Sequence, residues 1–132
     1  MTITRIDPDG LAPAIGYSQV TVAEGTRIVH VAGQVGITPD GKIVGPDHRS
    51  QIEQALRNLK LALEAAGASD EDVAKVTLYV VDDGPEVLGA LFEASAAVWG
   101  PEPPTNAATL VGVAALADPE YKVEIEATAV LT

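Results

Sequence analysis

The chain has 132 residues, the size of one domain, and 47% of them are hydrophobic although only 4% are aromatic. A formal net charge of −11 argues against nucleic acids and anionic membranes as partners, because proteins bind those polyanions mainly through Lys and Arg. The sequence has no cysteine, which excludes disulfides, a thiolate nucleophile and a cysteine metal site.

No segment approaches the roughly 20 consecutive apolar residues of a membrane span. The first five residues also lack the basic-then-apolar order of a signal peptide. We therefore expect a single domain over residues 1–132, in the cytoplasm and with no membrane partner.

Three short strands are predicted first in chain order, at residues 2–6, 17–22 and 27–32. The second and third are joined by a turn at residues 23–25 and are interpreted as a hairpin. A further turn is predicted at residues 39–42, where Pro, Asp and Gly follow one another.

A helix is predicted from a cap at Asp47 to about Ala66, with Gly67 as the residue that ends it. The strand predicted after it, residues 73–81, is apolar on both sides in its second half, which is typical of a central strand. The helix carries an apolar stripe made of Ile52, Leu56, Leu59 and Leu63, with Ala55, Ala62 and Ala66 beside it.

A second helix is predicted to open at Gly84-Pro85, with Trp99 near its end. The proline-rich residues 100–104 are expected to form an extended connector, and residues 107–115 and 121–131 are predicted strands. The side chains expected to face inward from this helix are Val87, Leu88, Leu91 and Phe92.

The resulting order, ββ(β)αβαββ, predicts an α+β fold in which two helices cover one face of a mixed sheet. The last three strands carry apolar residues that we assign to both sides of the sheet. An uncovered second face would then expose an apolar patch of more than a few hundred Å². We therefore predict that other subunits cover it. The apolar residues concerned are Val76, Leu78, Val80, Leu110, Val111, Val113, Val123 and Ile125.

The last strand alternates strictly, with one side wholly apolar and Glu124 and Glu126 on the other side. An acid in such a strand is either solvated at an edge or held in a pocket, where it needs a partner or can handle protons. The pattern alone leaves both interpretations open.

Other candidate motifs are interpreted as structural. His30 and His48 lie far apart, and no cluster of zinc ligands can be assembled, so no metal site is predicted. None of the serines lies in a Gly-x-Ser-x-Gly elbow, which argues against a serine hydrolase. Gly33-Gln34-Val35-Gly36 resembles a fragment of a phosphate loop, but a strand end that needs an unusual φ or a close approach is favoured.

Several segments, in order along nearly the whole chain, together resemble the RidA/YjgF family, which is also labelled the endoribonuclease L-PSP or translation inhibitor family. The combination is specific, although the single fragments are not. The segments are residues 17–19, 31–35, 54–59, 63–69, 76–80, 111–116 and 123–127.

The resemblance implies a chorismate-mutase-like fold and a homotrimer. Its sheets would face inward as a barrel, with the helices outside and a cleft at each subunit interface. The family's best-known members hydrolyse reactive enamines and imines, such as 2-aminoacrylate, without a metal or organic cofactor. In them an arginine holds the substrate carboxylate, while a glutamate and backbone groups position the attacking water.

Carried over by position, the family's glutamate matches Glu124, its cleft tyrosine Tyr17 and its glycine Gly33. The position of the arginine holds Ala108, followed by Thr109. Losing both charge-assisted hydrogen bonds of a guanidinium would cost on the order of 3–6 kcal/mol, or ~10²–10⁴ in binding.

Typical imino-acid activity therefore depends on another cation, and Arg27, Lys75 and Lys122 are the candidates on predicted strands. Two hypotheses follow: a deaminase-like hydrolase with Glu124 as general base, or a trimer that binds a small ligand without chemistry. The acidic balance disfavours a ribonuclease or translation inhibitor. A total of eight Lys and Arg disfavours a chorismate mutase, whose dicarboxylate substrate needs several cations.

Overall fold

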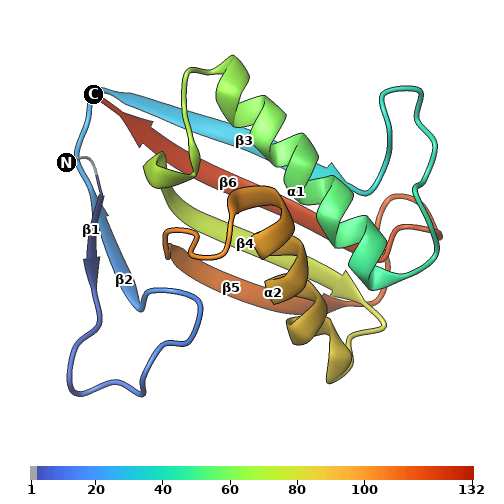
Figure 1. Cartoon of the computed structure of the whole chain (residues 1–132), viewed down its shortest axis with the longest axis horizontal. Coiled ribbons are helices and arrows are strands. Elements are labelled where there is room, and N and C mark those ends of the chain that lie inside the picture. The colour runs from blue at the N-terminus through green and yellow to red at the C-terminus, as the bar shows by residue number, and fades with distance from the viewer. Residues whose placement is uncertain (1–2) are drawn as a thin grey trace.

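Two helices lie on one face of a four-stranded sheet in the computed structural model, which describes residues 3–132 (Figure 1). The strand order is β3 (Arg27–Val35), β6 (Val123–Leu131), β4 (Val73–Val81), β5 (Ala107–Val113). β4 and β5 are parallel and the other pairs are antiparallel. The helices are α1 (His48–Ala65) and α2 (Glu86–Trp99), and a short 3₁₀ helix, Asp70–Asp72, precedes β4. The predicted α+β class, element order and central position of residues 73–81 are confirmed.

The last strand has the alternation that its sequence predicts. Every second side chain is buried against the helices, and the residues between them are half-buried on the opposite face. This burial fixes the register, because a slip of one residue would turn the whole apolar set away from the core. The buried residues are Val123, Ile125, Ala127, Ala129 and Leu131.

Helix α1 begins and ends close to the predicted residues. The Asp47 side chain caps it by accepting a hydrogen bond from the Ser50 amide, and Gly67 follows it with φ +80°. The predicted stripe is buried, and Gln51 is buried beside it. The Gln51 amide nitrogen donates to the carbonyls of Gly45 (2.8 Å) and Glu120 (3.0 Å), so this polar residue joins two loops.

The inward face of α2 differs from the prediction. Val87, Ala94 and Val98 are buried, whereas Leu88 is 53% exposed and Phe92 is 41% exposed. Their prediction as inward residues was therefore wrong. The buried positions recur at helical spacing along a stripe that passes beside Leu88 and Phe92, because α2 packs chiefly on α1.

The predicted hairpin between residues 17–22 and 27–32 is also wrong. β2 (Val20–Ala23) pairs with β1 (Ile3–Ile6) in a separate two-stranded sheet, at the end of the main sheet where β3 begins (Figure 1). The turn at Gly25 runs against the end of β6, where an added Cβ would lie 2.9 Å from the Leu131 carbonyl carbon. The chain therefore enters β3 alongside β6 rather than folding back along β2. Thr2, the predicted start of the first strand, lies outside the described residues.

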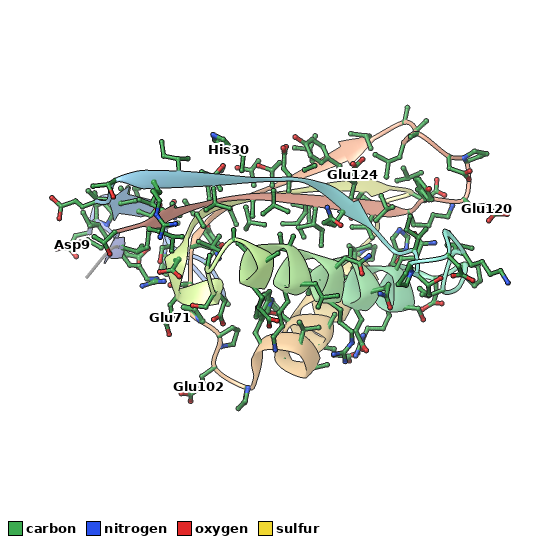
Figure 2. The ribbon with its side chains drawn as sticks, turned by 90° about the horizontal axis from the view of Figure 1, so that it is seen from above. Asp9, His30, Glu71, Glu102, Glu120 and Glu124 are labelled. Carbon is green, nitrogen blue, oxygen red and sulfur yellow. The ribbon has the colours of Figure 1, made fainter. Side chains whose placement is uncertain are left out.

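The sheet face turned away from the helices is more polar than predicted. Of the apolar residues assigned to both sides, Val76, Leu78, Val80, Val123 and Ile125 belong to the core on the helix side. The open face carries His30 and Glu124, which Figure 2 shows on the side opposite the helices. Its exposed apolar side chains lie on the edge strands, Ile28 on β3 and Val111 on β5.

Neither helix of the described chain has the combination of length and apolarity that a membrane crossing requires.

Candidate functional site

The carboxylate of Glu124 lies against the backbone of Gly33. Glu124 is on β6, where it pairs in register with Val35 of β3 and Tyr79 of β4. A Cβ atom at residue 33 would lie 2.6 Å from the carboxyl carbon of Glu124. Only glycine lets the carboxylate come this close, and the favoured interpretation of Gly33 as a site of close approach is confirmed.

A β-bulge produces this contact. The pairing of Val31 with Ala127 is followed by that of Gln34 with Ile125, so Ala32 and Gly33 together oppose one residue of β6. A bulge interrupts the ladder and re-aims the neighbouring groups, and bulges are frequent next to active sites. The Gln34 amide group donates to the Ala32 carbonyl at 3.0 Å. The bulge therefore leaves the backbone of Ala32 and Gly33 outside the regular ladder, next to the Glu124 carboxylate.

Glu126, the next acid along the same face, is held by Tyr79. The Tyr79 hydroxyl donates a hydrogen bond to the Glu126 carboxylate. This bond raises the pKa of Tyr79 above its ordinary value, and desolvation and the charges of Glu126 and Glu124 act in the same direction. Tyr79 thus remains a hydrogen-bond donor at neutral pH and fixes one of the two acids.

The remaining residues predicted for the site lie at the opposite edge of the sheet, around β5. Thr109 is exposed on the open face, where its hydroxyl accepts a hydrogen bond from Lys75 at 2.7 Å. Ala108 has the opposite orientation and lines a cavity between the sheet and the helices. Tyr17 precedes an isolated bridge between Ser18 and Ala107, which holds it beside the start of β5.

Within one chain, the structure thus brings Gly33 and Glu124 together and leaves Tyr17, Ala108 and Thr109 as a second group at the β5 edge. The two groups belong to opposite edges of the sheet, because β3 and β5 are its outermost strands.

The three candidate cations occupy different places. Lys75 lies on the open face beside Thr109, Lys122 forms an ion pair with Asp82, and Arg27 opposes Leu131 at the end of β3 remote from Gly33. Sequence reasoning did not single out Arg5, whose guanidinium donates to the Thr105 carbonyl shortly before β5.

Tyr79 was also missed as a site residue. Its signal was present, because alternation along β4 puts Tyr79 on the side opposite the buried Leu78 and Val80. The pairing of β4 with β6, which gives it Glu126 as a partner, is a tertiary fact. Among residues 3–132, no group of three or more His, Asp or Glu side chains is arranged to hold a metal ion.

Comparison with known proteins gives one family and several full-length relatives. The sequence pattern of the family described as Endoribonuclease L-PSP matches residues 8–131. A 2-iminobutanoate/2-iminopropanoate deaminase of Dermatophagoides farinae is 34% identical over 137 residues, covering 99% of each chain. A RutC family protein of Pyrococcus horikoshii is 46% identical over 67 residues, and this match spans about half of each protein, 50% of this chain and 52% of the relative.

Solved structures of Rid family proteins are also similar to this chain. YyfB, a Rid family protein of unknown function from Yersinia pestis, has a TM-score of 0.90 and 38% identity, covering 99% of this chain and 100% of the other. RidA from the Antarctic bacterium Psychrobacter has a TM-score of 0.70 and 31% identity, covering 97% and 99%.

Proposed function

The chain belongs to the endoribonuclease L-PSP family, and we therefore propose that it hydrolyses a small imine or enamine at a site built around Glu124. The observation that carries the proposal is the contact between the Glu124 carboxylate and Gly33 at the β-bulge. A carboxylate beside interrupted backbone can accept a proton from water while the backbone groups orient that water. Several relatives are named 2-iminobutanoate/2-iminopropanoate deaminase, which supports this choice of reaction.

In the proposed reaction, Glu124 takes a proton from water as the water oxygen bonds to the imine carbon. Glu124 returns this proton to the imine nitrogen, which gives a carbinolamine. It then takes the proton of the new hydroxyl group and passes it to the same nitrogen as the carbon–nitrogen bond breaks, so that the products are a carbonyl compound and ammonia. Tyr79 acts here as a positioning residue, because its hydrogen bond keeps Glu126 at a fixed place on the same face. No further reactant is required.

The substrate is expected to differ from a simple imino acid. Ala108 supplies no donor at the position of the family's arginine, and a carboxylate held by one lysine lacks the planar fork of a guanidinium. Lys75 and Arg5 are the cations near β5. Lys75 already donates to Thr109, and Arg5 donates through Nε to the Thr105 carbonyl while its Nη2 is buried without a partner among the described residues. We therefore expect weak binding of small imino acids and better binding of an uncharged imine.

We further propose a homotrimeric barrel in which the β3 edge of one chain meets the β5 edge of the next. Two observations support this. Both edge strands carry exposed apolar side chains, Ile28 and Val111. The two groups of site residues also lie at these two edges, so the contact would bring Glu124 of one chain near Thr109 on the open face of another.

The test is imine hydrolysis by the native protein and by Glu124→Gln. The imines are formed in situ by an amino-acid oxidase, or added as an uncharged ketimine, and their disappearance is compared with the rate in buffer. Removing a general base should lower the catalysed rate by ~10²–10⁴-fold. Glu64→Gln, an exposed position on α1, is the matched control and should keep the native rate.

A second candidate function, binding of a small ligand without turnover, is favoured by the alanine at position 108. It predicts that native and Glu124→Gln proteins both match the rate in buffer, while ligands raise the melting temperature. A ribonuclease activity is disfavoured by the net charge of −11.

A further inference from the structure

A cavity of about 120 Å³ lies on the helix side of the sheet, separated from the Glu124 carboxylate by the sheet itself. Its walls come from both helices, from β4 and β5, and from the connector after α2. Leu56, Leu59, Leu78, Leu91, Trp99 and Ala108 supply most of the apolar lining. It is thus a space distinct from the candidate site on the open face.

The chemistry of the lining selects against negative charge. Asp70 is the single ionisable residue among the lining residues, and it is an acid, so a carboxylate or phosphate would find no cation there. The side chains of Ser95 and Asn106 add two neutral polar groups. An anion is thus excluded, and because most of the remaining lining is apolar, an uncharged ligand with at most a hydroxyl or carbonyl facing those groups fits best.

The size and shape favour a single aromatic ring. An apolar cavity of roughly 150 Å³ in another protein remains dry and takes up benzene, and the present cavity is of similar size. The rings of Phe92 and Trp99 in its wall can pack edge-to-face with an aromatic guest. Phe92 is 41% exposed, so one wall of the cavity reaches the surface.

The mouth is shaped by a glycine. Gly16 has φ +81°, and a Cβ atom there would lie 2.5 Å from the Phe92 ring. The loop before β2 can therefore rest directly on Phe92, and a turn of that ring would open the cavity. Ala108 contributes to the same space, because a longer side chain from β5 would project into it.

We propose that this cavity is a binding pocket for a small, neutral, single-ring aromatic molecule. The pocket shares Ala108 with the second group of predicted site residues, but its lining contains neither Glu124 nor Gly33, so its occupancy can be tested separately from hydrolysis. The small side chain of Ala108 leaves room for such a ligand, whereas an arginine at this position would project into the cavity.

The probe is toluene, with benzoate as its charged counterpart. Trp99 is the one tryptophan of the chain, so its fluorescence reports on the cavity wall directly. Toluene should change this emission saturably, and benzoate at the same concentration should not. Glu124→Gln should bind toluene as the native protein does, which separates this proposal from the catalytic one.

Two substitutions that fill the cavity with a larger side chain test whether toluene binds there. Ala108→Leu fills the cavity from β5, and Ser95→Leu fills it from α2; each should weaken toluene binding by about tenfold or more. Ala107→Leu adds the same atoms to the neighbouring residue, which faces the other side of β5, and should bind normally. Circular dichroism identifies any variant that fails to fold, and Ser95→Leu then serves alone.

The proposal is overturned if toluene causes no saturable change up to its solubility limit. Native affinity in a folded filled variant, or equal affinity for benzoate, would overturn it as well.

Discussion

At the scale of single residues, the contact between Gly33 and Glu124 is the feature that sequence spacing could not provide. The two residues are far apart in the chain and meet because a bulge in β3 shifts the register opposite β6. Alternation along β6 predicted which side of the strand Glu124 occupies. It could not predict that a glycine would lie beneath the carboxylate.

The Gly33 contact can be tested by adding one methyl group. Gly33→Ala should displace the Glu124 carboxylate and lower kcat/KM for imine hydrolysis by ~10–10²-fold, because small misplacements of a catalytic group are costly. The fold should survive, since the carboxylate is the flexible end of a side chain. Gly89→Ala in α2 is the control, because nothing lies within 4 Å of an added Cβ there. Equal activity of Gly33→Ala and Gly89→Ala would contradict the assigned contact.

The Tyr79–Glu126 hydrogen bond predicts a pH effect. A hydroxyl whose pKa is raised on folding adds stability below its ordinary value of 10.0, and that stability is lost as the pH rises through the raised pKa. The ionisation of the tyrosines can be followed by absorbance as the pH is raised, and Tyr79→Phe should remove the ionisation phase that occurs at the highest pH. Tyr121→Phe should leave that phase in place. If the late phase persists in Tyr79→Phe, the hydrogen bond is not present in solution.

At the scale of elements, long periodic segments were predicted well and short ones were not. The α1 stripe and the alternation of β6 each involve many residues, and a buried face enforces them. The hairpin prediction failed because the turn at Gly25 is held by Leu131, a contact that no local pattern contains. The inward face of α2 was misassigned because its packing against α1 decides which side chains are covered, and the sequence pattern does not fix that packing.

Gln51 gives the sharpest prediction at this scale. Its side chain is fully buried, and besides its two donated bonds it accepts a hydrogen bond from the Lys122 amide at 2.7 Å. Gln51→Leu would remove the side-chain partner of three backbone groups in part-buried hydrogen bonds and should cost about 1–3 kcal/mol in urea unfolding. Gln54→Leu, whose native partner is the Asn58 side chain, should cost less than about 1 kcal/mol. Similar losses in the two variants would mean that Gln51 does not join the loops as described.

At the scale of the whole molecule, the composition of the open sheet face bears on whether several chains associate. Five of the eight apolar residues from which the sequence predicts a covered second face belong to the core on the helix side. Two features still favour an open face covered by other chains. Both edge strands carry exposed apolar side chains, and the site residues are divided between these strands. A barrel of three chains would cover those side chains and leave the helices outside.

The matched pair Ile28→Glu and Leu61→Glu tests this arrangement. Ile28 on β3 is 66% exposed and Leu61 on α1 is 64% exposed, so the two substitutions are alike except for the face on which they lie. In the proposed barrel, a carboxylate at residue 28 would be buried without a partner, and the assembly should dissociate. Light scattering should then give three times the chain mass of 13.6 kDa for the native protein and Leu61→Glu, and the single-chain mass for Ile28→Glu. A native protein that is monomeric at micromolar concentration, or dissociation by Leu61→Glu alone, would contradict a barrel with its helices outside.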